Sequence, residues 1–194
     1  MKIIGIAGTL GSGKDTIADF LVEQEDFYHV STGDLVREES MKRHGSIERN
    51  PYLQETATHL RRTHGGDILI KRGLERFKQQ TKKHNGIVFT GIRSLGEARG
   101  VKASGGTLLY IDAPIEIRYE RVQKRLRDNE AHVSLEQFRQ NELNEQTQSD
   151  HEAEFNIYKI KDEADVVILN DSDIDTFIEK AKKALKLDWA YACE

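Results

Sequence analysis

Short apolar runs alternate with longer amphipathic stretches along this chain. Apolar runs rich in β-branched residues predict strands, whereas apolar residues that recur every three to four positions predict helices. Strands are predicted at 3–7, 87–90, 108–111 and 166–169, with a weaker one at 28–31. Helices are predicted at 14–24, 34–43, 52–64, 67–82, 95–103, 114–127, 134–148 and 173–186.

This alternation of strands and helices predicts an α/β fold. Strands joined by helices form parallel sheets with right-handed crossovers, and the helices then cover both faces of the sheet. The first and last predicted strands are nearly continuous aliphatic runs, which is typical of strands buried on both faces. We therefore expect a three-layer fold around a parallel sheet of about five strands.

Two of the predicted helices begin with a capping signal. Ser94 is followed by Glu97, and Ser134 is followed by Gln137. In this pattern the serine side chain accepts a hydrogen bond from the N–H group three residues later, which fixes the start of the helix.

Helix 114–127 separates its apolar residues from its arginines. Its predicted core face consists of Ile115, Tyr119, Val122 and Leu126. On a flank about 90° away by the helical period lie Arg118, Arg121 and Arg125. Because a guanidinium binds two phosphate oxygens at once and stays charged, this flank suits a phosphate ligand.

Length and composition favour one domain. The chain has 194 residues, which predicts a single domain over 1–194. The stretch 127–150 is strongly polar and is the candidate for a small helical lid. The only cysteine, Cys193, excludes an intrachain disulfide, as expected of a cytoplasmic protein.

Charge and hydrophobicity argue against two kinds of partner, long nucleic acid and a membrane. There are 29 basic and 33 acidic residues, a net charge of −4, whereas general nucleic-acid binders carry a basic excess. The longest strictly aliphatic run, 166–169, is far shorter than the roughly 20 residues that span a bilayer. We expect neither long nucleic acid nor a membrane as a partner.

Residues 8–16, GTLGSGKDT, form the most informative segment and are called the phosphate loop below. The segment follows a predicted buried strand and opens a helix, which is the context of a Walker A motif. Glycines allow such a loop to wrap around a phosphate, and the helix N-terminus adds about half a positive charge. The residues expected to bind nucleotide phosphates are Gly8, Gly11, Ser12, Gly13, Lys14, Asp15 and Thr16.

Three residues of the loop define its expected chemistry. Lys14 can bridge the β- and γ-phosphates, and the Thr16 hydroxyl can reach a phosphate oxygen or a metal ion. Asp15 departs from the general motif, which has Ser or Thr at this position. We expect ATP and Mg²⁺ as the cofactors, with Thr16 on the metal side.

The phosphate loop resembles that of the nucleoside monophosphate kinases, and its Lys-Asp-Thr resembles the phage-type deoxynucleoside monophosphate kinases. The segment STGDLVR at 31–37 is similar to the family's acceptor segment, which implies that Thr32 and Arg37 hold the acceptor nucleotide. Gly-Ile-Arg at 91–93 falls where the family has Gly-Phe-Pro-Arg. The resemblance implies that Arg93 binds the acceptor phosphate.

The second half of the chain extends the resemblance. Arg121 and Arg125 are similar in spacing to two family arginines that contact the transferred phosphates. Glu97-Ala98 and Gly105-Gly106 also resemble dephospho-CoA-kinase-like nucleotide kinases. The resemblance implies the P-loop kinase fold.

One departure from the family concerns the metal. Thr90 stands where the family has an aspartate that orders water around Mg²⁺. Asp15, Asp34 and Asp112 are the remaining carboxylates to consider near the metal, and the sequence does not choose among them.

Together these features predict an ATP-dependent phosphotransferase that moves the γ-phosphoryl group to a nucleoside or deoxynucleoside monophosphate. Lys14, Arg93, Arg121 and Arg125 would supply the cations around the moving group. The acceptor is expected to be a small nucleotide.

Two alternatives stay open. In a dephospho-CoA-kinase-type enzyme the acceptor is a ribose hydroxyl, which needs a general base, and Asp34 is the best-placed carboxylate. A P-loop ATPase or nucleotide-binding regulator is the alternative of another class. Thr32, Arg37 and Arg93 argue against it, because a hydrolase needs no second nucleotide site.

Overall fold

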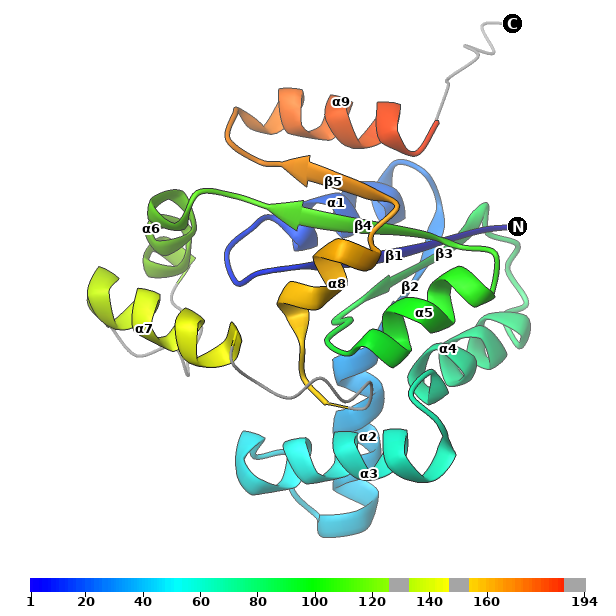
Figure 1. Cartoon of the computed structure of the whole chain (residues 1–194). Helices are drawn as coiled ribbons and strands as arrows, with labels where there is room; N and C mark the ends of the chain where they lie inside the picture. Colours follow the sequence, from blue (N-terminus) through cyan, green and yellow to red (C-terminus); the bar gives the residue numbers. More distant parts are fainter. Residues whose placement is uncertain (126–132, 147–153, 187–194) are drawn as a thin grey trace, which may run out of the picture.

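The computed structural model describes residues 1–125, 133–146 and 154–186, and it contains a five-stranded parallel sheet (Figure 1). The strands are β1 (Lys2–Gly8), β2 (Phe27–Ser31), β3 (Gly86–Thr90), β4 (Thr107–Asp112) and β5 (Val166–Leu169). Their spatial order is β2-β3-β1-β4-β5, with every neighbouring pair parallel. The predicted α/β fold with a parallel sheet is confirmed.

Helices follow the strands in the predicted alternation. They are α1 (Lys14–Glu23), α2 (Thr32–His44), α3 (Gln54–His64), α4 (Ile68–Lys78), α5 (Leu95–Ala103), α6 (Ile115–Arg125), α7 (Leu135–Gln146), α8 (Ile157–Glu163) and α9 (Ile174–Ala184). A short π-helical turn, Arg49–Leu53, precedes α3. The hydrophobic pattern missed only α8 among these helices, since so short a segment offers little periodicity.

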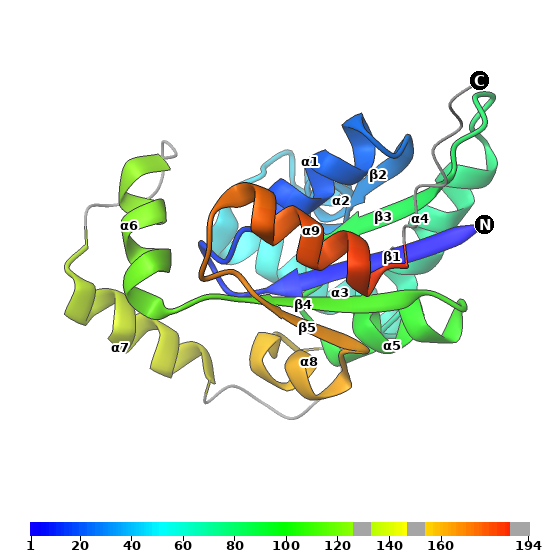
Figure 2. The ribbon, with the colours of Figure 1, turned by 90° about the horizontal axis from the view of Figure 1, so that it is seen from above.

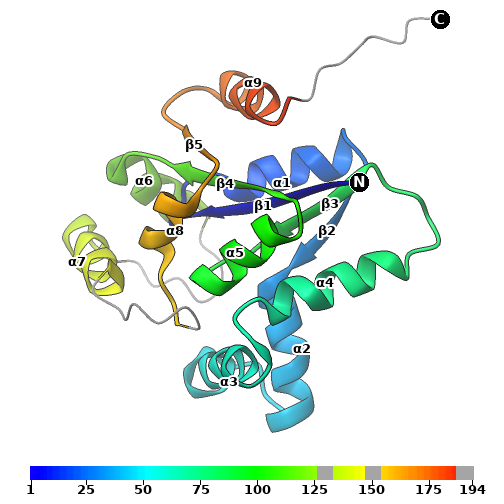
Figure 3. The same cartoon turned by 45° about the vertical axis from the view of Figure 1, so that its right-hand side comes forward.

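Helices cover both faces of the sheet (Figure 3). A hydrophobic core lies on each face. Residues of α1 and α9 pack on one face, where Ile17 and Phe177 meet the sheet residues Ile6 and Val88. Residues of α2, α3, α4, α5 and α8 pack on the other face. Adjacent strand residues alternate between the two cores because successive side chains of a strand point to opposite faces.

Helices α6 and α7 lie beyond the carboxyl ends of the strands, away from both cores (Figure 2). The predicted apolar core face of α6 is therefore wrong in part. The buried residues of α6 are Arg118 and Val122, and Tyr119 packs edge-on against Phe138 of α7. The position of α6 at the end of the sheet decides which face is covered, and periodicity cannot show that position.

The prediction that the last strand is buried on both faces is also wrong. Strand β5 forms the edge of the sheet, where Val167 and Leu169 are each 46% exposed and Ile168 is buried. An aliphatic run shows that a strand is apolar, but its place in the sheet depends on pairing with distant strands.

The two predicted helix caps are confirmed. The hydroxyl of Ser94 accepts a hydrogen bond from the N–H of Glu97 at 3.3 Å, and that of Ser134 accepts one from Gln137 at 3.1 Å. Of the candidate lid at 127–150, residues 127–132 and 147–150 lie outside the described residues. No helix within the described ranges is long and apolar enough to cross a membrane.

Candidate functional site

The phosphate loop connects the carboxyl end of β1 to the first turn of α1. The N–H of Ser12 donates to the carbonyl of Thr9 at 3.3 Å, and the ammonium of Lys14 donates to the same carbonyl at 3.3 Å. Gly11 and Gly13 have φ angles of +78° and +97°, which side chains rarely adopt. The loop conformation thus depends on its glycines, as the motif predicts.

The same two glycines allow close approach of other elements. A Cβ atom on Gly11 would lie 2.6 Å from the carbonyl oxygen of Arg118, so the loop packs directly on the backbone of α6. A Cβ atom on Gly13 would overlap the side-chain amide of Asn170. The loop is therefore enclosed by α6 on one side and by the segment after β5 on another.

A cavity of about 270 Å³ opens between the phosphate loop and α6. Its lining includes the loop residues Lys14, Asp15 and Thr16 and the α6 residues Arg121 and Arg125. Three predicted cationic residues from two separate elements therefore line one cavity. An arrangement of this kind, at the N-terminus of a helix, is suited to a polyphosphate.

The two arginines of the cavity have different partners. Arg121 donates to the backbone carbonyl of Asn170 at 3.5 Å and to its side-chain oxygen at 3.2 Å. Burial lowers the pKa of the Arg121 guanidinium, although an arginine remains charged at neutral pH. Arg125 lies 3.7 Å from the carboxylate of Asp15, which is thus an ion-pair partner inside the cavity.

Two buried hydroxyl groups of the phosphate loop bear on whether the loop suits a phosphate ligand. The side-chain oxygens of Thr9 and Ser12 are buried, and neither has a hydrogen-bond partner among the described residues. A buried hydroxyl without a partner is unfavourable and rare in folded proteins. Phosphate oxygens could accept hydrogen bonds from groups of this kind at the loop.

The donor set of the loop also fits Mg²⁺. This ion is usually held by one or two protein oxygens together with substrate phosphates and water. Thr16 offers a hydroxyl and Asp15 a carboxylate beside the cavity. By contrast, Asp112 accepts from the N–H of Ala113 at 2.9 Å and pairs with Lys161 at 2.7 Å, which engages both of its oxygens.

The predicted acceptor residues begin at the carboxyl end of β2. Thr32 is buried, and its hydroxyl donates to the carbonyl of Gly91 at 2.6 Å, which ties α2 to the end of β3. Ser31 caps α2 by accepting from the N–H of Asp34 at 3.2 Å. The exposed carboxylate of Asp34 forms an ion pair with Arg37 in the same helix.

Arg93 follows β3 and is held through its backbone. Its N–H donates to the carboxylate of Glu97 at 2.8 Å, and its carbonyl accepts from the N–H of Asn156 at 2.8 Å. Its guanidinium lies 5.5 Å from the centre of the Phe155 ring. Because β3 is the neighbour of β1, the segment carrying Arg93 leaves the sheet beside the phosphate loop.

The structure thus groups the predicted site residues in two places. Lys14, Arg121 and Arg125 share the cavity, whereas Arg37 and Arg93 do not line it. Arg118, the third arginine of the predicted positive flank, is buried and donates to Glu142 of α7 at 2.7 Å, which gives it a structural role.

Sequence reasoning missed Asn170, which contacts both the phosphate loop and Arg121. It also missed the buried ion pair between Arg61 of α3 and Glu97 of α5, at 2.8 Å. For Asn170 the only available signal was its place directly after an apolar strand, at the carboxyl end of the sheet, where open α/β folds bind ligands.

The fold and the phosphate loop together define a P-loop nucleotide-binding protein with a kinase-like fold. Residues 4–148 match a protein family described as an AAA domain. A UPF0200 protein of Methanococcus vannielii is 31% identical over 187 residues, which make up 96% of each chain. The chain belongs to the AAA-domain family and to the UPF0200 family.

Another UPF0200 protein, from Saccharolobus islandicus, is 32% identical over 188 residues, covering 94% of this chain and 92% of the relative. Among solved structures, TT1252 from Thermus thermophilus matches with a TM-score of 0.61 and 20% identity over 96% of both chains. A shikimate kinase from Bacteroides thetaiotaomicron matches with a TM-score of 0.58 and 12% identity, covering 95% and 98% of the two chains. At these identities the structural likeness concerns the fold.

Proposed function

We propose that the protein is an ATP-dependent phosphotransferase that acts on a nucleoside or deoxynucleoside monophosphate. The observation that carries the proposal is the cavity shared by Lys14, Arg121 and Arg125 at the phosphate loop. A protein that only binds ATP needs the phosphate loop but not the two arginines. Two further arginines from α6 suit a protein that stabilises charge on a phosphoryl group during transfer.

The second group of residues supports an acceptor beside the loop. Thr32 and Gly91 join the ends of β2 and β3 through one hydrogen bond, and Arg93 follows directly. Since β3 lies next to β1, these residues leave the sheet on the side where the phosphate loop begins. An acceptor phosphate bound by Arg93 would then approach the donor from the neighbouring strand end.

In the proposed reaction an oxygen of the acceptor phosphate forms a bond to the γ-phosphorus of ATP. The bond between that phosphorus and the bridging β-phosphate oxygen breaks, and ADP leaves with the electron pair. Lys14, Arg121 and Arg125 hold the phosphate oxygens in line while negative charge shifts between them. When bound, Mg²⁺ would neutralise part of this charge, with Thr16 and Asp15 as its protein oxygens.

ADP release with ATP–Mg²⁺ tests the proposal. Each ribo- and deoxynucleoside monophosphate and dephospho-CoA is added separately, and the rate is compared with that of ATP alone. We expect one class of monophosphate to raise the rate at least about tenfold, since positioning of both reactants is the main source of catalysis. Rapid ATP turnover that no acceptor changes would instead identify an ATPase.

Replacing Asp34 by Asn distinguishes a monophosphate acceptor from a hydroxyl acceptor. A general base contributes about 10²–10⁴-fold, so Asp34→Asn would nearly abolish transfer to a ribose hydroxyl. For a monophosphate we expect kcat to fall by less than about tenfold, because phosphate is already a nucleophile and the change only weakens the ion pair with Arg37.

The measurement is kcat and KM with the acceptor found in the screen. Glu163→Gln is the matched control, because Glu163 forms a comparable exposed ion pair with Arg99 outside the site. A loss of more than about a hundredfold in Asp34→Asn alone would contradict the monophosphate reaction.

A further inference from the structure

Asn170 joins two parts of the site that are far apart in the sequence. Its side-chain N–H donates to the carbonyl of Ser12 at 2.8 Å, and its side-chain oxygen accepts from Arg121 at 3.2 Å. Its backbone carbonyl accepts a second, longer bond of 3.5 Å from Arg121. One planar amide therefore contacts both the phosphate loop and the α6 arginine of the cavity.

The residue is fixed in place before it makes these contacts. It is buried, and its backbone N–H donates to the carbonyl of Asp112 at 2.8 Å, which extends the pairing of β5 with β4. Gly13 has no side chain where the amide of Asn170 lies, so the loop and the amide are in close contact. Any shift of Asn170 would have to move the loop or Arg121 as well.

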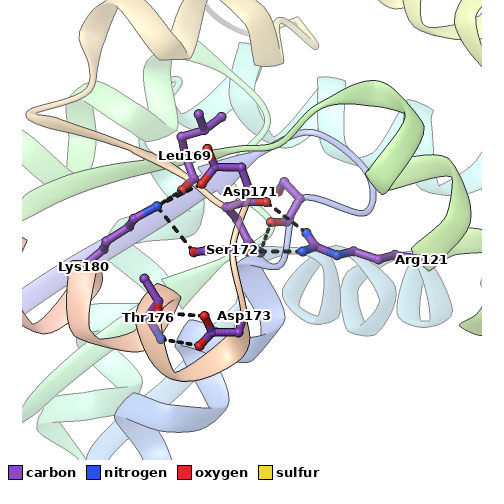
Figure 4. A network of polar contacts seen from close by, with 9 residues as sticks. Arg121, Leu169, Asp171, Ser172, Asp173, Thr176 and Lys180 are labelled. Carbon is purple, nitrogen blue, oxygen red and sulfur yellow. Dashed lines mark hydrogen bonds and ion pairs between the residues drawn. The ribbon is translucent and has the colours of Figure 1, made fainter.

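A separate set of contacts stabilises the segment 171–173, which follows Asn170 (Figure 4). Lys180 of α9 donates to the carbonyl of Leu169 at 3.1 Å and pairs with Asp171 at 2.9 Å. Asp173 caps α9 by accepting from the N–H of Thr176 at 2.9 Å. These residues stabilise the turn between β5 and α9 but do not line the cavity, so they are suitable controls.

We propose that Asn170 is a positioning residue that holds the Arg121 guanidinium and the phosphate loop in one fixed arrangement for the nucleotide phosphates. The proposal rests on the proposed function. The side-chain amide of Asn provides a donor and an acceptor in one uncharged planar group. The contacts from Asn170 occupy two of the five N–H donors of Arg121, so others can bind phosphate oxygens. Burial of Arg121, which lowers its pKa, agrees with a guanidinium held between protein groups.

The test is a double-mutant cycle on the affinity for ATP. Asn170→Ala, Arg121→Ala and the double variant are compared with wild type by titration calorimetry with ATP–Mg²⁺. Loss of a hydrogen bond to a charged group lowers affinity by about ten- to a hundredfold. We expect each single variant to lose affinity in this range and the double variant to lose clearly less than the product of the two losses, because part of the effect of Asn170 acts through Arg121.

Asn170→Asp keeps an acceptor for Arg121 but cannot donate to Ser12, and it adds a negative charge near the loop. It should bind ATP at least as weakly as Asn170→Ala, and it serves as the second variant if Asn170→Ala does not fold. Lys180→Ala is the control and should keep wild-type affinity, although its thermal midpoint falls.

Multiplied losses in the double variant, or wild-type affinity in both Asn170 variants, would overturn the proposal. An equal loss in Lys180→Ala would also overturn it, since general loosening of the turn would then be enough. ATP binding without phosphoryl transfer to any acceptor would remove the proposed function and still leave the coupling measurable. A wild-type protein that binds no ATP would refute both.

Discussion

Replacing Lys14 by Met is expected to lower phosphoryl transfer by about a thousandfold, because one donor aimed at developing charge contributes about 10²–10³ in kcat. Lys14 lines the cavity with Arg121 and Arg125, so in the proposed site its ammonium would reach the same phosphates as these arginines. Met is unbranched and only one atom shorter than Lys, and it removes the charge. The loss therefore reports on electrostatic stabilisation.

The fold should tolerate this change. Lys14 is partly exposed, and its hydrogen bond to the carbonyl of Thr9 is 3.3 Å long. A neutral replacement of such a contact lowers the free energy of unfolding by about 1 kcal/mol. Thermal unfolding, ATP affinity and kcat measured on the same preparation separate loss of structure from loss of chemistry.

Lys124→Met is the matched control. Lys124 is exposed on α6, the helix that carries both arginines, but it does not line the cavity. We expect its kcat to stay within about twofold of wild type, since an isolated surface charge contributes little. If Lys14→Met kept more than a tenth of the wild-type kcat, the cavity would not be the place of phosphoryl transfer.

The features predicted correctly from the sequence are local. Strand β1 and the glycines of the phosphate loop lie close together in the sequence, and their conformations follow from neighbours in the chain. The caps at Ser94 and Ser134 also involve groups only three residues apart. For these elements, composition and spacing contain most of the physical information.

The features that were missed depend on contacts across the fold. Periodicity places Arg118 beside Arg121, yet Arg118 is buried because α7 offers it Glu142. The side chain of Asn170 donates to a carbonyl 158 residues away in the chain. Arg118 and Arg121 have the same chemistry but different partners, because different distant elements lie next to them. The sequence pattern does not contain this information.

The buried pair of Arg61 and Glu97 shows the same dependence, and it leads to the largest expected effect on stability. Glu97 is 0% exposed and Arg61 only 7%. One carboxylate oxygen accepts two hydrogen bonds from Arg61, at 3.0 and 2.8 Å. The other accepts from the backbone N–H of Arg93 at 2.8 Å. The carboxylate of Glu97 therefore links helix α5 to helix α3 and to the segment that carries Arg93.

Glu97→Gln is expected to lower the free energy of unfolding by about 3–5 kcal/mol, since removing one partner leaves the other charge buried without compensation. For a chain of this size that corresponds to a fall in Tm of roughly 6–20 °C. The glutamine N–H₂ group would also face donors from Arg61 or Arg93, so KM for the acceptor should rise more than KM for ATP.

Arg61→Met in the Glu97→Gln background should recover part of the lost stability, because the unpaired charge is then removed. Chemical denaturation of both single variants and the double variant gives the coupling energy, expected at about 1–3 kcal/mol. The exposed pair of Arg99 and Glu163, also anchored on α5, is the control, with an expected coupling below about 1 kcal/mol. Equal coupling in the two pairs would mean that burial of Glu97 does not strengthen its bond to Arg61, and the effect on acceptor KM would then need another cause.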